Sequence, residues 1–310
     1  MRQITMKIFG IGDRGNSMIW HMLQQPLQGV EYIAVNTIQH SLKQFSVKQK
    51  LLLEQNPIKG YGTEAATELG KRSARSCKEE IIARMKGADM VLLCGGLGSD
   101  MGSGALPVFA QLAKQMHTLT IAFVTLPFPF EEEKRMCIAK SALEDIYTNA
   151  DTCITLSNQY ILQQLKNTEI ESACSMADRM IQQGIQALYE LITIPVYINV
   201  DYADIRTTMA EQKHGFIGVG YGRGAYKGEQ AVAQALSACF LEHDIAGLHH
   251  AIVHICGNSA LTLDEVQQII NRIHDEAGEA LDIIFGMAFN ENLQDEMCIR
   301  DRQSPLLYIL

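Results

Sequence analysis

The sequence predicts an α/β fold with a mainly parallel, doubly wound sheet, a long connecting helix and a second α/β domain. Short apolar runs alternate with longer amphipathic segments in the first half of the chain. Glycine-rich turns follow two of these runs, and one long amphipathic segment separates the two halves. Because ligands of doubly wound sheets gather at the carboxyl ends of the strands, these glycine turns are candidate binding sites.

The first half contains apolar runs of strand length, most of them followed by a segment with apolar residues at helical spacing. The expected strands are residues 4–12, 30–36, 89–96, 119–128 and 151–157. The expected helices are residues 16–25, 78–88, 105–115 and 132–147. Helices inserted between strands favour parallel pairing, because each strand can then return in the same direction.

The long segment "SMADRMIQQGIQALYELI" predicts an amphipathic helix over residues 175–192, with Ser175 as its N-cap. Its apolar face is expected to contain Met176, Met180, Ile181, Ile185, Leu188 and Ile192, and its polar face Asp178, Gln182, Gln186 and Glu190. Further apolar or glycine-rich runs follow at residues 195–205, 215–224, 247–257 and 281–289, with helices expected over 229–240 and 262–277. We therefore expect domains over residues 1–172 and 196–296, joined by a helix over 173–195.

The composition is that of a soluble globular protein of 310 residues, with 47% apolar residues and a mean hydropathy near zero. A formal net charge of −9 and a pI near 5.5 argue against nucleic acid or an anionic membrane as a primary ligand. The eight cysteines form no CxxC pair, which is typical of reduced thiols in the cytosol. No signal peptide and no run of membrane-spanning length are expected.

The first glycine turn, "GIGDRG" at Gly10 to Gly15, matches GxGxxG and suggests a dinucleotide-binding fold. A nicotinamide-dependent dehydrogenase would place an acid about 20 residues later to bind the ribose hydroxyls. This chain has Asn36 and Thr37 there, which argues against hydride transfer. Taken alone, the turn is compatible with nucleotide binding or with tight packing only.

The second glycine turn, "GGLGSDMGSG" at Gly95 to Gly104, lies between an expected strand and an expected helix. Backbone amides and a helix N-terminus at such a turn can bind an anion, and two neighbouring turns could bind one polyphosphate. Neither turn is a P-loop, because no Gly-Lys-Ser/Thr follows. The acid Asp100 in the middle of this turn is unexpected at a phosphate site.

At these glycine turns the chain resembles the tubulin/FtsZ superfamily, and within it the FtsZ family of bacterial cell division. The resemblance covers residues 5 to 296 and runs through "LQGVEYIAVNT", "KGADMVLLCGGLG", "LTIAFVTLPFPFEEEKRM", "NVDYADIR" and "IIFGMAF". It implies a tubulin-like GTPase domain that binds GTP or GDP with Mg²⁺ and polymerises head to tail.

The resemblance also assigns site residues. The nucleotide-binding residues would be Gly12, Asp13, Arg14, Gly15, Asn16, Gly98, Ser99, Asp100, Met101, Gly102, Ser103, Gly104, Glu131, Arg135, Asn158 and Asp178. Among them, Asn158 and Asp178 would contact the guanine, and Glu131 and Arg135 the ribose and phosphates. Asp201 and Asp204, with Asn199 as a polar companion, would enter the next subunit's site and position the attacking water. No protein ligands are expected for the metal, which the nucleotide and water would hold.

Without the resemblance, purely structural roles also remain open for the same residues. Asp201 and Asp204 could cap a helix, Asp178 could cap the long helix, and Glu131 and Arg135 could form an exposed helix start. His250 and His254 have metal-like spacing, but their apolar context and the lack of a third ligand argue against zinc.

The chain departs from the family pattern at several positions. The signature GGGTGTG is matched by Gly98 to Gly104, with Asp100 and Met101 among the changes, and the aromatic residue expected four positions before Asp178 is Cys174. Asp13 and Arg14 replace small residues. Arg14 could add a phosphate contact or pair with Asp100, or both charges could be exposed.

We expect a bacterial GTPase that assembles with itself in the cytoplasm, at the division site, and reaches the membrane only through adaptor proteins. Asp100 motivates the alternative, a filament-forming or filament-capping relative with weak or no GTP hydrolysis, because an unpaired carboxylate repels a triphosphate. The final residues, 297–310, depart from the family and are expected not to be native.

Overall fold

The computed structural model describes residues 4–54, 63–156, 170–193, 200–237, 249–258, 261–278, 281–289 and 308–309. The chain forms two compact units. Unit 1 comprises Met1–Gln182 and Ala210–Gly215, and unit 2 comprises Gln183–Met209 and Phe216–Leu310. Helix α8 (Ile170–Thr193) contributes its first part to unit 1 and its last part to unit 2.

Unit 1 is built on a seven-stranded sheet with the order β3-β2-β1-β4-β5-β6-β7, in which every pair is parallel. The strands are β1 (Met6–Ile11), β2 (Glu31–Asn36), β3 (Gln49–Leu52), β4 (Met90–Gly96), β5 (Leu119–Thr125), β6 (Thr152–Leu156) and β7 (Lys213–Gly215). The prediction of a doubly wound parallel sheet is confirmed. The two edge strands, β3 and β7, were not expected from the sequence.

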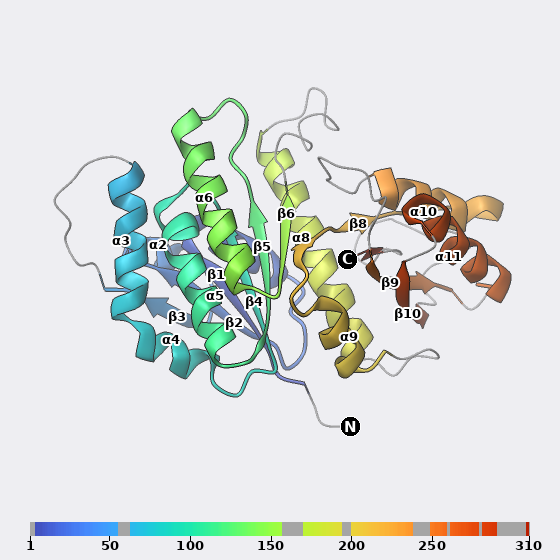
Figure 1. Ribbon diagram of the computed structural model, residues 1–310, viewed down its shortest axis with the longest axis horizontal. Helices are drawn as coiled ribbons and strands as arrows, with labels where there is room; N and C mark the ends of the chain where they lie inside the picture. Colours follow the sequence, from blue (N-terminus) through green and yellow to red (C-terminus); the bar gives the residue numbers. More distant parts are fainter. Residues whose placement is uncertain are drawn as a thin grey trace. The chain divides into compact units, whose positions relative to one another are not determined.

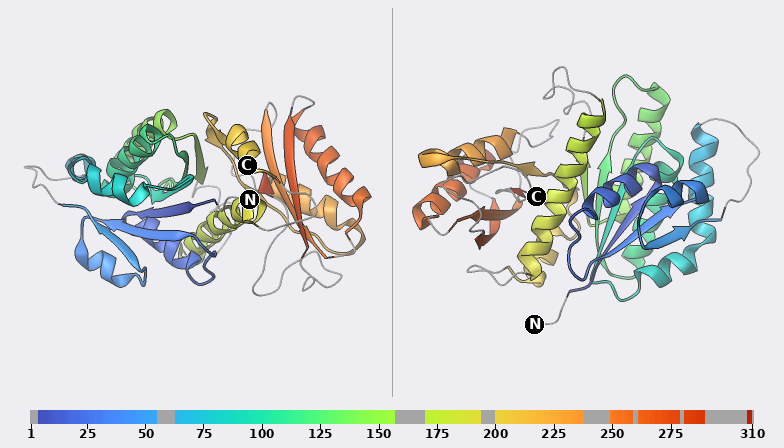
Figure 2. Two further views of the ribbon diagram at one scale, coloured as in Figure 1. Left: turned by 90° about the horizontal axis from the view of Figure 1, so that it is seen from below. Right: turned by 180° about the vertical axis from the view of Figure 1, so that it is seen from behind.

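Helices cover both faces of this sheet (Figures 1 and 2). One face carries α3 (Thr63–Ser76), α4 (Lys78–Met85), α5 (Leu106–Gln115) and α6 (Glu133–Asn149). The other carries α1 (Gly12–Met22), α2 (Gln39–Gln44) and the first part of α8. The central strands β1, β4 and β5 are buried along their whole length, as a parallel sheet covered on both faces requires.

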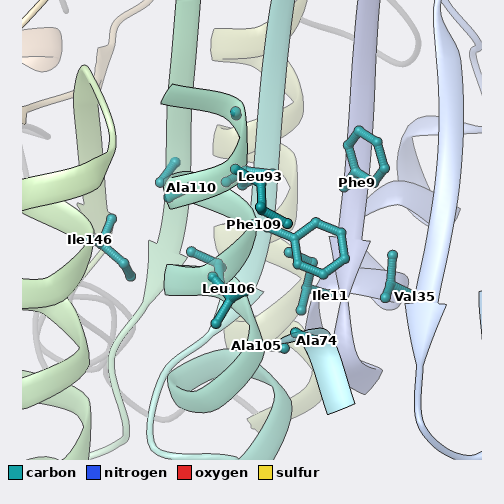
Figure 3. Close-up of a cluster of buried hydrophobic side chains, with 14 of the residues drawn as sticks. Phe9, Ile11, Val35, Ala74, Leu93, Ala105, Leu106, Phe109, Ala110 and Ile146 are labelled. Atoms are coloured by element: carbon teal, nitrogen blue, oxygen red, sulfur yellow. The ribbon is translucent and has the colours of Figure 1, made fainter. Parts of the chain in front are cut away.

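Apolar side chains of α5 fill the space between the sheet and its helices. Phe109 lies fully buried against Phe9 of β1, with ring centroids 5.8 Å apart in an edge-to-face arrangement. Figure 3 shows Phe109 and Leu106 pointing toward the strand residues Ile11 and Leu93. This core fixes the carboxyl ends of β1 and β4, where the two glycine turns begin.

Unit 2 contains a four-stranded sheet with the order β10-β9-β11-β8. β9 (His250–Gly257) and β10 (Asp282–Phe289) are parallel, and β11 (Tyr308–Ile309) pairs antiparallel with β9 and with β8 (Gly218–Val219). The helices are α9 (Tyr202–Met209), α10 (Lys227–Ser237) and α11 (Leu263–Ala277), with a 3₁₀ turn at Gly224–Tyr226. Helices α10 and α11 cover one face of the sheet (Figure 2). Most of residues 297–310 lie outside the described residues.

Two acids on the polar face of α8 are withdrawn from solvent. Asp178 is only 1% exposed, and Glu190 lies with its carboxylate 3.4 Å from Nε2 of buried His254 on β9. Gln186 also donates to Glu190 at 2.8 Å. Each of these two acids thus meets a polar partner on a neighbouring element.

Burial determines the titration of this pair in unit 2. Desolvation lowers the pKa of His254 to about 4 and raises the pKa of Glu190, although the Gln186 hydrogen bond partly opposes the latter shift. A depressed histidine pKa means that the unfolded chain binds the proton more readily than the folded chain. Its contribution therefore destabilises unit 2 as the pH falls below about 6.5.

We predict that acidification from pH 7 to pH 5 destabilises β9 through His254 by about 2 kcal/mol. The raised pKa of Glu190 stabilises the folded state as the pH falls, which opposes the effect of His254. The test therefore compares variants of the two histidines on β9 by hydrogen exchange of the β9 amides. The loss at pH 5 should disappear in His254→Gln and persist in His250→Gln, whose side chain lies on the same strand and is 38% exposed. Equal pH dependence in both variants would refute the assignment to His254.

Candidate functional site

The two glycine turns lie side by side at the carboxyl ends of β1 and β4. Gly12 begins α1 with φ +73°, and a Cβ there would lie 2.8 Å from Cβ of Met101 in the second turn. Gly15 approaches β4 so closely that a Cβ would lie 2.2 Å from the carbonyl oxygen of Cys94. Glycine at position 12 therefore leaves room for the side chain of Met101, and glycine at position 15 lets α1 approach the backbone of β4.

The second turn opens a helix five residues earlier than the sequence suggested. A π-helical turn over Asp100–Ala105 continues directly into α5. Ser99 caps it, because its hydroxyl accepts from the amide of Gly102 at 3.1 Å and donates to the carbonyl of Gly96 at 3.0 Å. The hydroxyl of Ser103 in turn accepts from the amide of Gly98 at 2.8 Å. These bonds fix the turn without any ligand.

The first amides of this helix are the groups that can bind an anion. Asp100 and Met101 are the first two helical residues, whose amides have no acceptor within the helix. The side chain of Met101 is 2% exposed and packs in the core, so this departure from the family pattern leaves the backbone available. Asp100 is half-buried, and its carboxylate adds negative charge at the same helix end.

Arg14 pairs with Asp178, not with Asp100. Its Nη1 lies 2.6 Å from Oδ1 of Asp178, and its Nη2 donates to the carbonyl of Cys174 at 3.2 Å. The contact to Oδ1 is an ion pair without an aligned hydrogen bond. The suggested pairing with Asp100 is therefore wrong, because the buried carboxylate attracts the guanidinium more strongly than a half-exposed one does.

Asp178 lies inside α8, eight residues after its start at Ile170, so the helix-capping interpretation is wrong. Its second oxygen, Oδ2, lies 2.8 Å from Nδ1 of His21 on α1. The carboxylate thus faces two side chains on one face of α1, at i and i+7. The sequence analysis did not identify His21. Its spacing of seven residues from Arg14, which puts both on one face of a helix, could have indicated it.

Other predicted nucleotide-binding residues have structural partners. Asn16 is fully buried and forms two 3.2 Å hydrogen bonds with the backbone of Val35, which tie α1 to β2. Asp13 accepts from the side chain of Asn36 at 2.8 Å. The position that would hold an acid in a dehydrogenase is therefore used to orient the first turn.

Glu131 and Arg135 form an ion pair at the start of α6, close to the second turn. Glu131 also accepts from the amide of Phe128, and a Cβ on Gly98 would lie 3.2 Å from the carbonyl oxygen of Arg135. The structure thus places this pair beside the second glycine turn. The predicted site residues Asn158 and Asn199 lie outside the described residues.

Helix α3 supports the second turn and was not expected from the sequence. A Cβ on Gly104 would lie 2.2 Å from the carbonyl oxygen of Thr67, and one on Gly70 would lie 2.2 Å from that of Asp100. Both are backbone contacts that a larger residue would prevent. In the sequence, only the glycine at position 70 could have indicated this close approach of α3 to the second turn.

The predicted catalytic acids belong to unit 2. Asp201 and Asp204 are both exposed at the start of α9, where the amides of Asp204 and Ile205 donate to the carbonyl of Asp201 at 3.0 and 3.2 Å. The backbone of Asp201 therefore starts the helix, while both carboxylates stay in solvent.

The described residues offer no ready-made metal cage. No group of three or more His, Cys, Asp or Glu side chains there could hold an ion. His254 contacts Glu190, and His250 lies 3.9 Å from Asp282. Burial, with a smaller contribution from the Asp178 charge, raises the pKa of Cys94, so this thiol stays protonated beneath the site.

The sequence matches two families of known proteins. Residues 5–166 match the Tubulin/FtsZ family, GTPase domain, and residues 214–300 match the FtsZ family, C-terminal domain. One relative is the cell division protein FtsZ of Mycoplasmopsis pulmonis, which is 34% identical over 295 residues, covering 95% of this chain and 75% of the relative.

Solved structures are similar over nearly the whole chain. An empty FtsZ dimer from M. jannaschii is 30% identical with a TM-score of 0.87, covering 99% of this chain and 88% of that one. CetZ2 from Haloferax volcanii, a GTPγS-bound protofilament, has a TM-score of 0.77 at 19% identity, over 93% of this chain and 90% of that one. The latter likeness concerns the fold alone.

We predict that Gly15→Ala destabilises unit 1 by about 1–3 kcal/mol, because the added methyl group meets the rigid carbonyl of Cys94. Urea unfolding followed by circular dichroism measures the loss. Gly87→Ala is the control. Gly87 has positive φ (+81°), but a Cβ there meets nothing within 4 Å, so only backbone strain of about 1 kcal/mol applies. A smaller loss for Gly15→Ala than for the control would contradict the close-packing account.

Proposed function

The chain belongs to the Tubulin/FtsZ family of GTPases, and from this premise we propose that unit 1 binds GTP across its two glycine turns and that a second copy supplies the hydrolytic acids. The observation that carries the proposal is the contact between the turns after β1 and β4, each of which opens a helix. Two helix N-termini at neighbouring strand ends suit a polyphosphate.

The phosphates would lie against the amides of Asp100 and Met101 and the start of α1. Glycine at positions 12 and 98 gives both turns positive φ, which supports close approach of the backbone to a ligand. Arg135, beside Gly98, is the nearby cation that would offset the charge of the phosphates. Its partner Glu131 would keep the guanidinium oriented.

The base would be read by Asp178. Guanine presents an N1–H and an amino group on one edge, and a carboxylate accepts from both. Adenine has an unprotonated N1 at the equivalent place, so the same carboxylate would repel it. The burial of Asp178 supports this role, because hydrogen bonds to a charged group discriminate more strongly away from water.

Hydrolysis would transfer the γ-phosphoryl group to a water positioned by Asp201 and Asp204. Both carboxylates are exposed at the start of α9. Exposed acids at a helix start suit insertion into the site of a second copy. Such a contact joins two different surfaces, so it repeats without closing and produces a filament.

The metal requirement follows from the substrate. Mg²⁺ usually bridges phosphate oxygens and neutralises charge that develops during phosphoryl transfer. Among the residues that the structure describes, no three His, Cys, Asp or Glu side chains form a group that could hold an ion. The nucleotide and water would therefore supply most of the ligands.

We place the protein in the bacterial cytoplasm at the division site, where it would reach the membrane only through adaptor proteins. The likeness to the FtsZ of Mycoplasmopsis pulmonis supports this placement. No helix among the described residues is long and apolar enough to cross a membrane.

A second candidate function is a filament-forming or filament-capping protein with weak GTP hydrolysis. Asp100 favours it, because its carboxylate lies at the helix end proposed to hold the phosphates. Two negative charges about 4 Å apart repel by about 1 kcal/mol even in water, and more strongly when partly buried.

We predict that Asp204→Ala lowers GTP turnover by about 10²- to 10⁴-fold while leaving nucleotide affinity unchanged, because the acid would act on the water and not on the base. Turnover should rise cooperatively with protein concentration in the unmutated chain. Phosphate release at several concentrations measures both effects.

The control for this prediction is Asp264→Ala, which removes an exposed acid from the first turn of α11. Equal turnover in Asp204→Ala and the control, or a rate strictly linear in protein concentration, would exclude hydrolysis between subunits.

We predict that Asp100→Asn tightens GTP binding on the order of tenfold, because the substitution removes the repulsive charge and keeps the side-chain shape. Calorimetric titration with Mg²⁺ measures the affinity. The gain should shrink as salt is raised, since salt screens a half-exposed charge. Unchanged affinity at low salt would remove the physical basis for the second candidate function.

A further inference from the structure

The carboxylate of Asp178 is closed to solvent by two side chains of α1. Asp178 is 1% exposed, whereas the side chains of Arg14 and His21 that cover it are 24% and 33% exposed. A guanine edge needs free acceptor positions on this carboxylate. At least one of the two covering side chains must therefore move before a base can reach it.

Arg14 is held at several points. Its guanidinium contacts both Asp178 and the carbonyl of Cys174. Its stem lies on the strand end, because a Cβ on Gly96 would be 2.8 Å from Cγ of Arg14. Removing this side chain would leave a buried carboxylate without its cation, which is strongly unfavourable. Arg14 is thus the fixed member of the pair.

His21 is held more weakly. Its Nδ1 makes one contact, 2.8 Å from Oδ2 of Asp178, and its ring otherwise lies 5.2 Å from the ring of Trp20 on the same helix. His21 and Trp20 are each about one-third exposed, so the imidazole of His21 can turn outward without entering the core.

We propose that His21 is the gate of the base site. In the nucleotide-free chain its imidazole occupies Oδ2 of Asp178, and it turns toward solvent when guanine binds, while Arg14 stays on Oδ1. The inference rests on the proposed function, in which Asp178 reads the base. His21 then sets nucleotide affinity without touching the phosphates.

The gate has opposite effects on the empty and the occupied site. Without His21, Oδ2 of the nucleotide-free chain loses its donor, so the empty protein becomes less stable. Binding no longer has to break the imidazole contact, so affinity should rise about tenfold, which is the order of one hydrogen bond to a charged group. A purely structural histidine would lower stability and leave affinity unchanged or weaker.

The experiment titrates the full chain with a fluorescent GDP analogue and compares four proteins: the unmutated chain, His21→Ala, His40→Ala and Asp178→Asn. His40 is an exposed histidine on α2 and serves as the matched control. We expect about tenfold tighter binding for His21→Ala, unchanged binding for His40→Ala and weaker binding for Asp178→Asn. The melting temperature of empty His21→Ala should fall, and GDP should raise it more than in the unmutated chain.

The two possible failures are distinguishable. If Asp178→Asn weakens binding but His21→Ala does not tighten it, the gate is refuted and the proposed base contact stands. If Asp178→Asn binds as tightly as the unmutated chain, the base contact is refuted and the gate falls with it.

Discussion

The contact between α1 and the strand end of β4 is the constraint on which the site depends. Gly15 approaches the carbonyl of Cys94, and Gly12 approaches Met101, at distances that exclude any side chain. Because glycine at both positions adds no side chain to the first turn, two helix N-termini lie together at the carboxyl ends of the central strands. The same approach brings α1 against α8, and so brings Arg14 and His21 to the buried carboxylate of Asp178.

Much of the fold could be predicted, because its central elements carry local signals. The segment over residues 262–277 predicts α11, and the apolar run around Phe123 predicts β5. The edge strands β3 (QKLL) and β7 (KHG) have only four and three residues. They are stabilised by pairing with β2 and β6, and periodicity does not detect such pairing.

The candidate site was predictable in its residues more than in its contacts. The glycine spacing located the two turns. The family resemblance proposed roles for Asp178 and for the acids at the start of α9. The pairing of Arg14 with Asp178 joins residues 164 positions apart, so no local pattern could favour it over Asp100. The burial of Met101 likewise follows from the direction of one side chain beneath Gly12, which sequence spacing does not specify.

The central claim is that two copies of the chain form one hydrolytic site, and mixing two inactive variants tests it most directly. Asp178→Asn should lack tight nucleotide binding and keep the acids of α9, whereas Asp204→Ala should bind GTP and lack one acid. The account predicts that a 1:1 mixture regains activity at about a quarter of its interfaces, because only one order of the two variants is productive. No recovery at any ratio, with both variants folded and co-assembled, would contradict it.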